Sequence, residues 1–544
     1  LEGKVAIVTG GASGFGESTV RLFAEQGAKV LIADVQDDLG LSLCNDLVSE
    51  SGYNDVIYVH CDVTQDSQVK NAVDTAISKF GKLDIMFNNA GIPGNLDFTI
   101  LDTDYENFKR VFEVNVFGPL LGAKHAARVM IPAKSGVILF TSSSASVVSG
   151  ESPHSYTVSK HAVVGLMKNL CVELGQYGIR VNCISPGSVS TPLLTTAMGL
   201  EKTAVDDIVC SSAVLKGVVP TAEDVAEAAL YLVSDSSKFV SGINLVVDGG
   251  YSTTNPTYTN SFNMQMNNSS PSPFAKRLQG KVAIVTGGAS GIGESTVRLF
   301  TKHGAKVVIA DVQDDQGASL CQELLSKPGN VVMYVHCDVT IDSDVQNVVD
   351  TTVSKYGKLD IMFNNAGISG DLDDTIMGSG LNNLKRVIEV NTFGSFLGAK
   401  HAARVMIPAK KGVILFTSSV SSVTAGYSSH AYTMSKHTVV GLMKNLCVEL
   451  GQYGIRVNCV SPSPVATPLL VDAVGMEMKV VVEESLRASA TLKGVMLTVE
   501  DVAEAALYLG SDEAKFVSGV NLVLDGGYST TNLSFPTMLK SFGL

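Results

Sequence analysis

The chain contains no tryptophan, and aromatic side chains make up only 6% of its 544 residues. It has no apolar run of the roughly 18 residues that a membrane-spanning helix requires, and nothing at its start has the pattern of a signal peptide. Cationic residues are in the minority, with 40 Lys and Arg against 53 Asp and Glu and a net charge of −13. The sequence therefore argues against a membrane or a nucleic acid as the partner.

Cysteine is also sparse, with nine residues, no C-x-x-C pair and no zinc-finger spacing. Because the cysteines lie singly inside apolar runs, we expect buried free thiols, a cytoplasmic location and no metal site. The chain begins with Leu1 rather than Met, so we expect that leading residues, and any targeting signal in them, are missing.

The most prominent feature of the sequence is a long internal repeat. "KVAIVTGGASG" starts at 4 and again at 281, "KLDIMFNNAGI" starts at 82 and 358, and residues 163–183 are identical to 439–459. A period of about 275 residues is far longer than the 20–50 residues of solenoids and propellers. It indicates a duplicated domain, with copy one at 1–251 and copy two at 278–544.

Residues 252–277 are expected to form a flexible linker between the copies. From Gly249 to Ala275 there is no charged residue, and Ser, Thr, Asn and Pro dominate, a composition that cannot bury enough apolar surface to fold alone. An alternative explanation of the repeat is that two adjacent genes have been joined, because Met264 or Met266 could open an independent chain.

Each copy alternates Val/Ile/Leu-rich runs with helical patterns. The runs in copy one are "KVAIVTG", "AKVLIAD", "VIYVHCD", "LDIMFNN", "GVILFTSS", "IRVNCISP" and "NLVVDGG". Nearly continuous apolar strands with helices between them are typical of a parallel sheet that is covered on both faces. The sequence predicts an α/β fold: two tandem doubly wound Rossmann-type domains, each with a mostly parallel seven-stranded sheet.

A glycine-rich loop follows the first strand of each copy and opens a helix. Glycines at this place allow a tight turn and a close approach of the backbone to a pyrophosphate, which the helix N-terminus also attracts. The expected cofactor-binding residues of the loop are Gly10, Ser13, Gly14, Phe15 and Gly16 in copy one and Gly287, Ser290, Gly291, Ile292 and Gly293 in copy two.

The second strand of each copy ends in an aspartate, Asp34 or Asp311. A carboxylate at this position accepts hydrogen bonds from a ribose 2′-hydroxyl and repels a 2′-phosphate, and no Arg or Lys stands beside it to reverse that preference. These residues predict NAD rather than NADP as the cofactor. A solvated aspartate in a turn is the alternative.

Tyr156 and Lys160 are four residues apart, so on a helix they share a face. A lysine ammonium beside a tyrosine favours the phenolate and turns it into a usable general base. The spacing alone is a weak indicator, because Tyr105 and Lys109 share it. That pair has Ile92 at the place where the true pair has a serine, Ser143, thirteen residues upstream; copy two repeats the full set as Ser419, Tyr432 and Lys436.

These motifs together resemble the short-chain dehydrogenase/reductase family over the whole chain except the linker. Both copies contain its T-G-x-x-x-G-x-G loop, an Asp-Val pair, N-N-A-G at 88–91 and 364–367, the serine, and Y-x-x-x-K. The resemblance implies further cofactor contacts from Asp62, Val63, Asn89, Gly91, Val189 and Thr191, and from Asp338, Val339, Asn365, Gly367, Val465 and Thr467. It also implies that Asn115 and Asn391 complete a catalytic tetrad by holding a water in the proton relay.

One loop departs from the family pattern. Copy one has "PGSVST" at 186–191, whereas copy two has "PSPVAT" at 462–467, which loses Gly187 and gains Pro464. We still expect function in copy two, but the substitution puts the geometry of this loop in question.

Within the family, "KHAARVMIPAKKGVILFTSS" and "LCVELGQYGIRVNCVSP" most resemble the plant secoisolariciresinol dehydrogenase-like group and its terpenoid-alcohol relatives. The resemblance implies an oxidoreductase of secondary metabolism that transfers a hydride between an apolar secondary alcohol and NAD. An NADPH-linked carbonyl reductase and a non-catalytic nucleotide-binding scaffold remain the alternatives.

The copies differ most at 93–107 and 369–383, at 144–155 and 420–431, and at 193–214 and 469–491. All follow the carboxyl ends of strands, where open α/β sheets bind ligands, so we expect different substrate walls, and the third segment is expected to form a lid.

The helices expected at 157–174 and 433–450 are nearly identical. They predict that the copies pair as an intrachain pseudo-dimer, with further self-association left open.

Overall fold

The computed structural model describes residues 1–51, 55–212, 219–238, 240–249, 251–253, 276–371, 375–426, 428–470, 496–515, 517–526 and 528–530. Most of the expected linker, 254–275, lies outside the described residues, as do 471–491 of the expected lid of copy two. Two compact units make up the chain: Leu1–Asn268 with Asp373–Leu381, and Ser269–Leu372 with Asn382–Leu544. The domain boundaries expected from the sequence stay a prediction.

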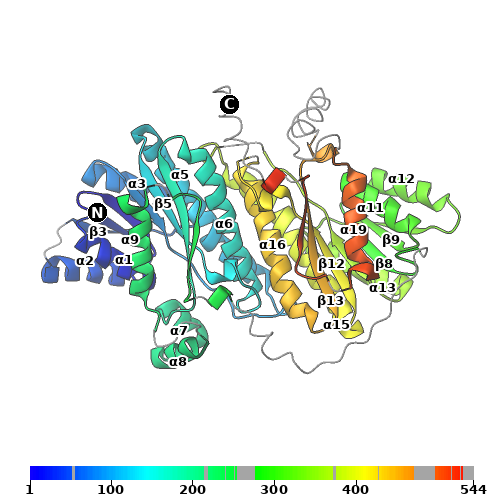
Figure 1. Ribbon diagram of the computed structural model, residues 1–544, viewed down its shortest axis with the longest axis horizontal. Helices are drawn as coiled ribbons and strands as arrows, with labels where there is room; N and C mark the ends of the chain where they lie inside the picture. Colours follow the sequence, from blue (N-terminus) through cyan, green and yellow to red (C-terminus); the bar gives the residue numbers. More distant parts are fainter. Residues whose placement is uncertain are drawn as a thin grey trace. The chain divides into compact units, whose positions relative to one another are not determined.

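Each unit contains one sheet of seven parallel strands, as the sequence predicts (Figure 1). In the first unit the spatial order is β3-β2-β1-β4-β5-β6-β7. The strands are β1 (Val5–Thr9), β2 (Lys29–Asp34), β3 (Val56–His60), β4 (Ile85–Asn88), β5 (Gly136–Thr141), β6 (Ile179–Pro186) and β7 (Asn244–Val247). The order reverses between β1 and β4, so the carboxyl ends of these two strands border the crevice where such sheets bind ligands.

Helices cover both faces of this sheet. On one face α1 packs beside α9, and on the other α3, α5 and α6 pack in succession (Figure 1). The helices are α1 (Gly14–Glu25), α2 (Asp37–Ser51), α3 (Asp66–Phe80), α4 (Tyr105–Phe112), α5 (Gly118–Ala133), α6 (His154–Gly175), α7 (Pro192–Met198), α8 (Lys202–Ser212) and α9 (Ala222–Val233), with a π-helical turn η1 (Glu113–Phe117) and short 3-10 turns η2 (Ser144–Ser146), η3 (Asp235–Ser237) and η4 (Tyr251–Thr253).

The second unit repeats this plan, with strand order β10-β9-β8-β11-β12-β13-β14. Its strands are β8 (Val282–Thr286), β9 (Lys306–Asp311), β10 (Val331–His336), β11 (Ile361–Asn364), β12 (Gly412–Thr417), β13 (Ile455–Pro462) and β14 (Asn521–Leu524). Its described helices are α11 (Gly291–Lys302), α12 (Asp314–Leu325), α13 (Asp342–Tyr356), α14 (Leu381–Ile388), α15 (Gly394–Ala409), α16 (His430–Gly451) and α19 (Val499–Gly510), with the π-helical turn η5 (Glu389–Phe393) and 3-10 turns η6 (Val420–Ser422), η8 (Asp512–Ala514) and η9 (Tyr528–Thr530).

The core of each unit forms between the sheet and its helices. Every residue of β1 is buried, and the apolar cluster against α1 and α9 includes Phe23, Ile32, Phe87 and Val225. Because both faces of the central strands are covered, their sequences are apolar throughout rather than alternating.

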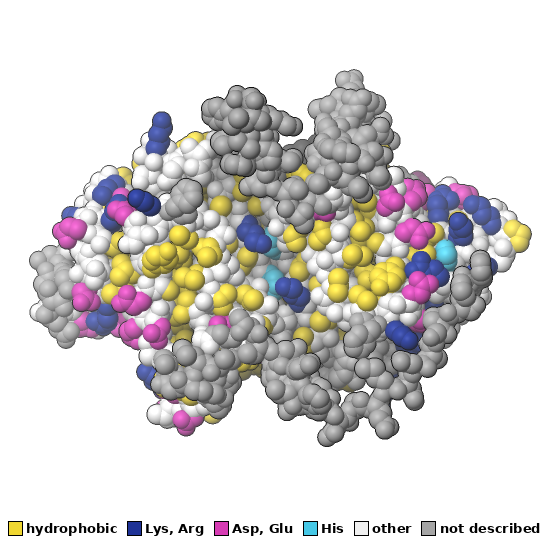
Figure 2. Space-filling view, in the orientation of Figure 1, with side chains coloured by type: hydrophobic (Ala, Val, Ile, Leu, Met, Phe, Trp, Pro, Cys, Tyr) yellow, Lys and Arg dark blue, Asp and Glu magenta, His cyan; other side chains and the backbone are white. Residues whose placement is uncertain are grey.

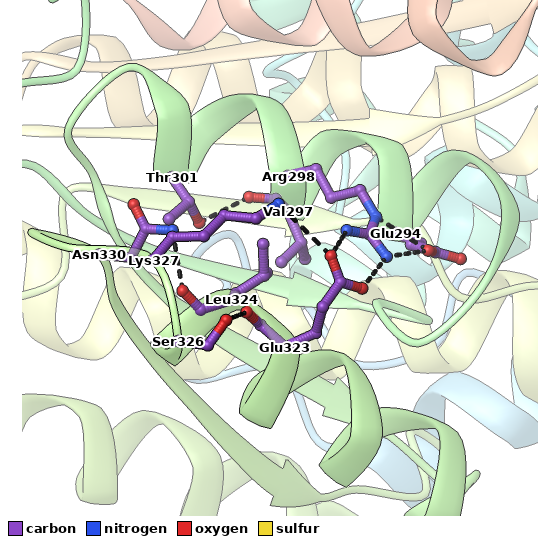
Figure 3. Close-up of polar contacts among 9 residues, drawn as sticks. All are labelled: Glu294, Val297, Arg298, Thr301, Glu323, Leu324, Ser326, Lys327 and Asn330. Atoms are coloured by element: carbon purple, nitrogen blue, oxygen red, sulfur yellow. Dashed lines mark hydrogen bonds and ion pairs between the residues drawn. The ribbon is translucent and has the colours of Figure 1, made fainter.

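An ion-pair cluster joins α11 to α12 in the second unit (Figure 3). Both terminal nitrogens of Arg298 donate to the Glu323 carboxylate at 2.7 Å, and its Nε donates to Glu294 at 2.9 Å. The hydrogen bonds from Arg298 lower the pKa of Glu323 to about 2. Asp46 occupies the equivalent position in the first unit, and its side chain is one methylene shorter, so this bidentate pair is a difference between the copies.

In Figure 2, Lys and Arg are interspersed with Asp and Glu on the visible face. None of the helices in the described part of the chain has the length and apolarity needed to cross a membrane. All nine cysteines are free, and Cys61, Cys183, Cys337 and Cys459 are buried.

Candidate functional site

The glycine-rich loops adopt a conformation that leaves the start of the following helix open. Gly10 and Gly14 have φ of +60° and +56°, a region that side chains rarely adopt. A Cβ on Gly16 would overlap the carbonyl oxygen of Gly10. Ser13, the N-cap residue of α1, makes no side-chain cap hydrogen bond, so the first N–H groups of the helix remain available to an anion.

The loop of the second unit has the same geometry. Gly287 and Gly291 have φ of +60° and +54°, and a Cβ on Gly293 would overlap the carbonyl oxygen of Gly287. Ser290 likewise makes no side-chain cap hydrogen bond at the start of α11. Both loops therefore fit a pyrophosphate.

Asp34 is held against this loop. Its Oδ2 accepts a hydrogen bond from the Ala12 N–H at 2.9 Å, its Oδ1 accepts one from the Gln36 N–H at 3.0 Å, and its side chain is only 4% exposed. Asp311 makes the same contact with Ala289 at 2.9 Å. The burial excludes a solvated turn aspartate. Since each carboxylate oxygen has two lone pairs, capacity remains for ribose hydroxyls.

Asn89 joins the ends of three strands rather than projecting freely. Its Nδ2 donates to the Thr9 carbonyl at 3.1 Å, and its Oδ1 accepts from the Thr141 hydroxyl at 2.9 Å. Asn365 makes the same contacts with Thr286 and Thr417. These bonds hold the strand ends together at the crevice between β1 and β4. The sequence alone did not point to Thr9 and Thr141, because their contact with Asn89 depends on the order of the strands in the sheet.

The Asp-Val pair after the third strand forms a tight turn. Oδ1 of Asp62 accepts hydrogen bonds from the Thr64 N–H at 2.9 Å and from its hydroxyl at 2.8 Å, and Asp338 repeats this with Thr340. Val63 is buried beneath Gly118, where a Cβ would lie 2.8 Å from a Val63 methyl. The turn is therefore rigid before any ligand binds.

Ser143, Tyr156 and Lys160 meet beside this crevice. Ser143 follows β5, while the other two lie on α6. Lys160 Nζ donates to the Thr141 carbonyl at 2.9 Å and lies 5.3 Å from the Tyr156 ring centroid. The Ser143 hydroxyl lies close enough to Tyr156 to influence the pKa of the phenol.

The second unit matches this cluster. Lys436 Nζ donates to the Thr417 carbonyl at 3.0 Å and lies 5.3 Å from the Tyr432 ring centroid, and Ser419 lies close enough to Tyr432 to influence its pKa. Gly91 and Gly367 stand beside the two lysines, each with a virtual Cβ 3.5 Å from Nζ. A glycine here leaves space for a ligand next to the ammonium.

Burial controls the protonation of both clusters. It raises the pKa of the Tyr156 hydroxyl, while the nearby Ser143 hydroxyl acts in the opposite direction, and Tyr432 behaves alike. This is the direction in the chain alone. The lowering expected from the sequence also requires the positive nicotinamide ring, so it stays a prediction. Burial also lowers the pKa of Lys160 and Lys436 to about 8, so both ammonium groups persist at neutral pH and are lost as the pH rises through about 8.

Asn115 lies in the π-helical turn η1 and is 1% exposed. Its Oδ1 accepts from the Ile92 N–H at 2.8 Å, and its Nδ2 donates to the Ile92 carbonyl at 2.9 Å and to Ser159 Oγ at 3.1 Å. Asn391 does the same with Ile368 and Ser435. The amide thus holds the segment after β4.

The altered loop of copy two keeps the geometry of copy one. The Thr191 N–H donates to the Val189 carbonyl at 2.7 Å, and Thr467 bonds Val465 at the same distance. Val189 and Val465 are each 6% exposed. The loop with Pro464 therefore keeps this hydrogen bond and the burial of the valine as they are in copy one.

One cavity in the second unit, of about 1350 Å³, unites these residues. It is lined by the glycine-rich loop, the carboxylates and the Ser–Tyr–Lys cluster. Its lining includes Gly287, Ser290, Gly291, Ile292, Asp311, Asp338, Val339, Asn365, Gly367, Ser419, Tyr432, Lys436, Val465 and Thr467. Of the residues predicted for copy two, Gly293 and Asn391 lie behind the wall, where they support it.

Some residues share the spacing of the Tyr–Lys pair or adjoin it in sequence but make other contacts. Tyr105 and Lys109 belong to α4, with the Lys109 ammonium 4.1 Å from its own Tyr105 ring centroid. His161 and His437 are buried in α6 and α16, where Nδ1 lies 3.0 Å from the carbonyl four residues earlier. Among the described ranges, no group of His, Cys, Asp and Glu side chains is arranged to hold a metal.

Fold and site together define a tandem pair of doubly wound nucleotide-binding α/β domains. A family model described as enoyl-(acyl carrier protein) reductase matches residues 10–252 and 287–529. The chain belongs to the short-chain dehydrogenase/reductase family, with one family domain in each half.

Plant proteins of this family are similar to half of the chain. Short chain aldehyde dehydrogenase 1 of Euphorbia lathyris is 62% identical over 282 residues, covering 51% of this chain and 97% of the relative. Secoisolariciresinol dehydrogenase of Forsythia intermedia is 55% identical over 259 residues, covering 48% and 92%. The crystal structure of the N-domain of a bacterial malonyl-CoA reductase with NADP covers 96% of this chain and 98% of its own, with a TM-score of 0.74 and 17% identity; it shares the fold alone.

Proposed function

We propose that each half is an NAD-dependent dehydrogenase that oxidises an apolar, lignan- or terpenoid-like secondary alcohol. The observation that carries this proposal is the cavity of the second unit, which runs from Asp311 to Ser419, Tyr432 and Lys436. Its volume of about 1350 Å³ exceeds the roughly 300–1,000 Å³ of a pocket for one small ligand, so it has room for a dinucleotide and a substrate together.

Charge in the cavity supports NAD over NADP. Among the described residues that line it, Lys436 is the one cation, against Asp311, Asp338, Asp501 and Asp525. A 2′-phosphate beside Asp311 would meet a carboxylate without a compensating guanidinium or ammonium. The same residue types stand at the equivalent places in the first unit.

The side chains have complementary roles in the proposed reaction. The tyrosine hydroxyl, as phenolate, takes the proton of the substrate hydroxyl, and the serine hydroxyl binds the substrate oxygen and polarises it. The lysine ammonium stabilises the phenolate and binds the nicotinamide ribose, and the asparagine fixes the loop after β4 or β11. NAD, when bound, accepts the hydride and adds positive charge that offsets the burial penalty on the phenolate.

The substrate class is supported by the wall of the cavity and by the relatives. Ile368, Val420, Leu469, Met496 and Leu497 provide apolar lining in the second unit. One relative is named for a lignan alcohol and another for an aldehyde, so both names indicate oxidation at a carbon that carries oxygen, while the rest of the substrate varies.

Removing the two cofactor-selecting carboxylates should erode the preference for NAD. Asp34→Ala with Asp311→Ala should lower the ratio of kcat/KM for NAD to that for NADP by about 10- to 100-fold, because a hydrogen bond to a charged group contributes about 1.5–3 kcal/mol. Asp38→Ala with Asp315→Ala is the matched control, since it removes exposed carboxylates from α2 and α12, the helices that follow these two strands. An unchanged ratio in the first variant would show that Asp34 and Asp311 do not face the ribose.

We also propose that the two halves pair within one chain. The support is that the long helices α6 and α16 are nearly identical in sequence, and a two-fold interface uses the same patch on both partners. Proteolytic cleavage engineered between Ser252 and Ala275 should leave the halves co-migrating on gel filtration with activity retained. Two separate peaks of half the mass would contradict pairing.

A further inference from the structure

The segments that follow the catalytic serines place a hydroxyl group differently in the two copies. Copy one reads Ser143-Ser144-Ala145-Ser146, and copy two reads Ser419-Val420-Ser421-Ser422. The fourth residue plays one part in both copies, because Ser146 and Ser422 donate to the backbone carbonyl of the catalytic serine at 2.7 and 2.6 Å. The difference is therefore confined to the two middle positions.

In copy two the displaced hydroxyl extends the catalytic cluster along the cavity wall. Ser421 N–H donates to Ser419 Oγ at 3.2 Å, and the two Oγ atoms are 3.4 Å apart. Ser421 Oγ lies 2.8 Å from Ser428 Oγ, and all three serines line the cavity with Tyr432. A row of three hydroxyls thus leads away from the atom that binds the substrate oxygen.

Copy one has an apolar side chain in the middle of this row. Ala145 occupies the position of Ser421 and is 5% exposed, the same as Ser421 itself. Ser143 and Ser152 occupy the ends of the row, so the alanine removes the hydroxyl that would connect them. The backbone is the same, since the Ala145 N–H also donates to its catalytic serine at 3.2 Å.

We propose that the second site recognises an alcohol with a second oxygen on the carbon next to the reacting one, such as a vicinal diol or hydroxyketone, through Ser421 and Ser428. The first site is selective for alcohols whose neighbouring carbon is apolar. A hydroxyl has one donor and two acceptor positions, so Ser421 can keep its contact with Ser428 and still bond the second oxygen. This inference rests on the proposed dehydrogenase function and deepens it.

The test compares cis-1,2-cyclohexanediol with cyclohexanol at one site at a time. In the Tyr156→Phe background, which leaves the second site, Ser421→Ala should lower the diol-to-cyclohexanol ratio of kcat/KM by about tenfold, the size of one hydrogen bond. In the same background Ser421→Thr, which keeps the hydroxyl, should preserve the ratio. In the Tyr432→Phe background, which leaves the first site, Ala145→Ser should raise it. Thr424→Ala is the control, because it removes a hydroxyl that bonds the Val420 carbonyl in the same segment but outside the cavity lining.

Ratios that stay the same in both Ser421→Ala and Ala145→Ser would overturn the proposal while leaving the dehydrogenase function intact. If neither alcohol is turned over in either background, the proposed function fails for these substrates, and a binding readout decides the inference separately. That readout is the rise in melting temperature of the NADH-saturated protein with each alcohol. A larger rise with the diol that disappears in Ser421→Ala supports the inference, and equal rises overturn it.

Discussion

Tyr156→Phe combined with Tyr432→Phe should lower the rate of NADH formation from NAD and a secondary alcohol by about 10²- to 10⁴-fold, the usual contribution of a general base. Either substitution alone should leave the other half of the chain catalytically active. The reason is that each tyrosine lies beside the serine and the lysine of its own unit. Steady-state absorbance of NADH with a panel of cyclic secondary alcohols measures the effect.

Tyr105→Phe provides the matched control for this experiment. Tyr105 has the same spacing to a lysine, but it lies on α4 with Lys109 against its ring, so turnover should be retained. If Tyr156→Phe alone silences the whole protein, copy two contributes no turnover, and the claim of two working sites is wrong.

Gly16→Ala and Gly293→Ala should each weaken NAD binding in one half. A Cβ at either place would overlap the carbonyl oxygen of the first glycine of the loop, and the loop must shift away from its pyrophosphate-binding geometry to relieve the clash. Overpacking of this kind costs about 1–3 kcal/mol, which corresponds to a loss of about 5- to 150-fold in affinity. Calorimetric titration of each variant with NAD measures the number and strength of the sites that remain.

Gly175→Ala and Gly451→Ala are the controls for the glycine variants. These residues end α6 and α16, and a Cβ on either would meet nothing within 4 Å, so both NAD sites should persist. Full-strength binding at two sites in the Gly293→Ala protein would show that the glycine-rich loop of copy two does not hold the cofactor.

The fold could be predicted from the sequence because the patterns that define it are short stretches of sequence and occur in both copies. Buried parallel strands have continuous apolar runs such as Val5–Thr9, and a glycine-rich loop between a strand and a helix has few other uses. The cluster of Ser143, Tyr156 and Lys160 was also predictable, since the lysine lies one helical turn from the tyrosine and the serine ends the neighbouring strand.

The contacts that position these residues were not predictable from spacing. The bond from Ala12 to Asp34 and the paired bonds between Asn115 and Ile92 join residues about 20 positions apart, and they depend on how the strands are ordered in space. The amide of Asn115 fixes the backbone after β4, and the water relay that the family resemblance implies for this residue stays a prediction. The direction of the tyrosine pKa also depends on burial, which no pair of residues reveals.

The central claim is that one chain carries two complete NAD sites, and calorimetric titration of the unmodified chain with NAD tests it most directly. We expect two NAD bound per chain, because the loop, the carboxylate and the Ser–Tyr–Lys cluster have the same contacts in both units. A saturating stoichiometry of one NAD per chain would contradict the account.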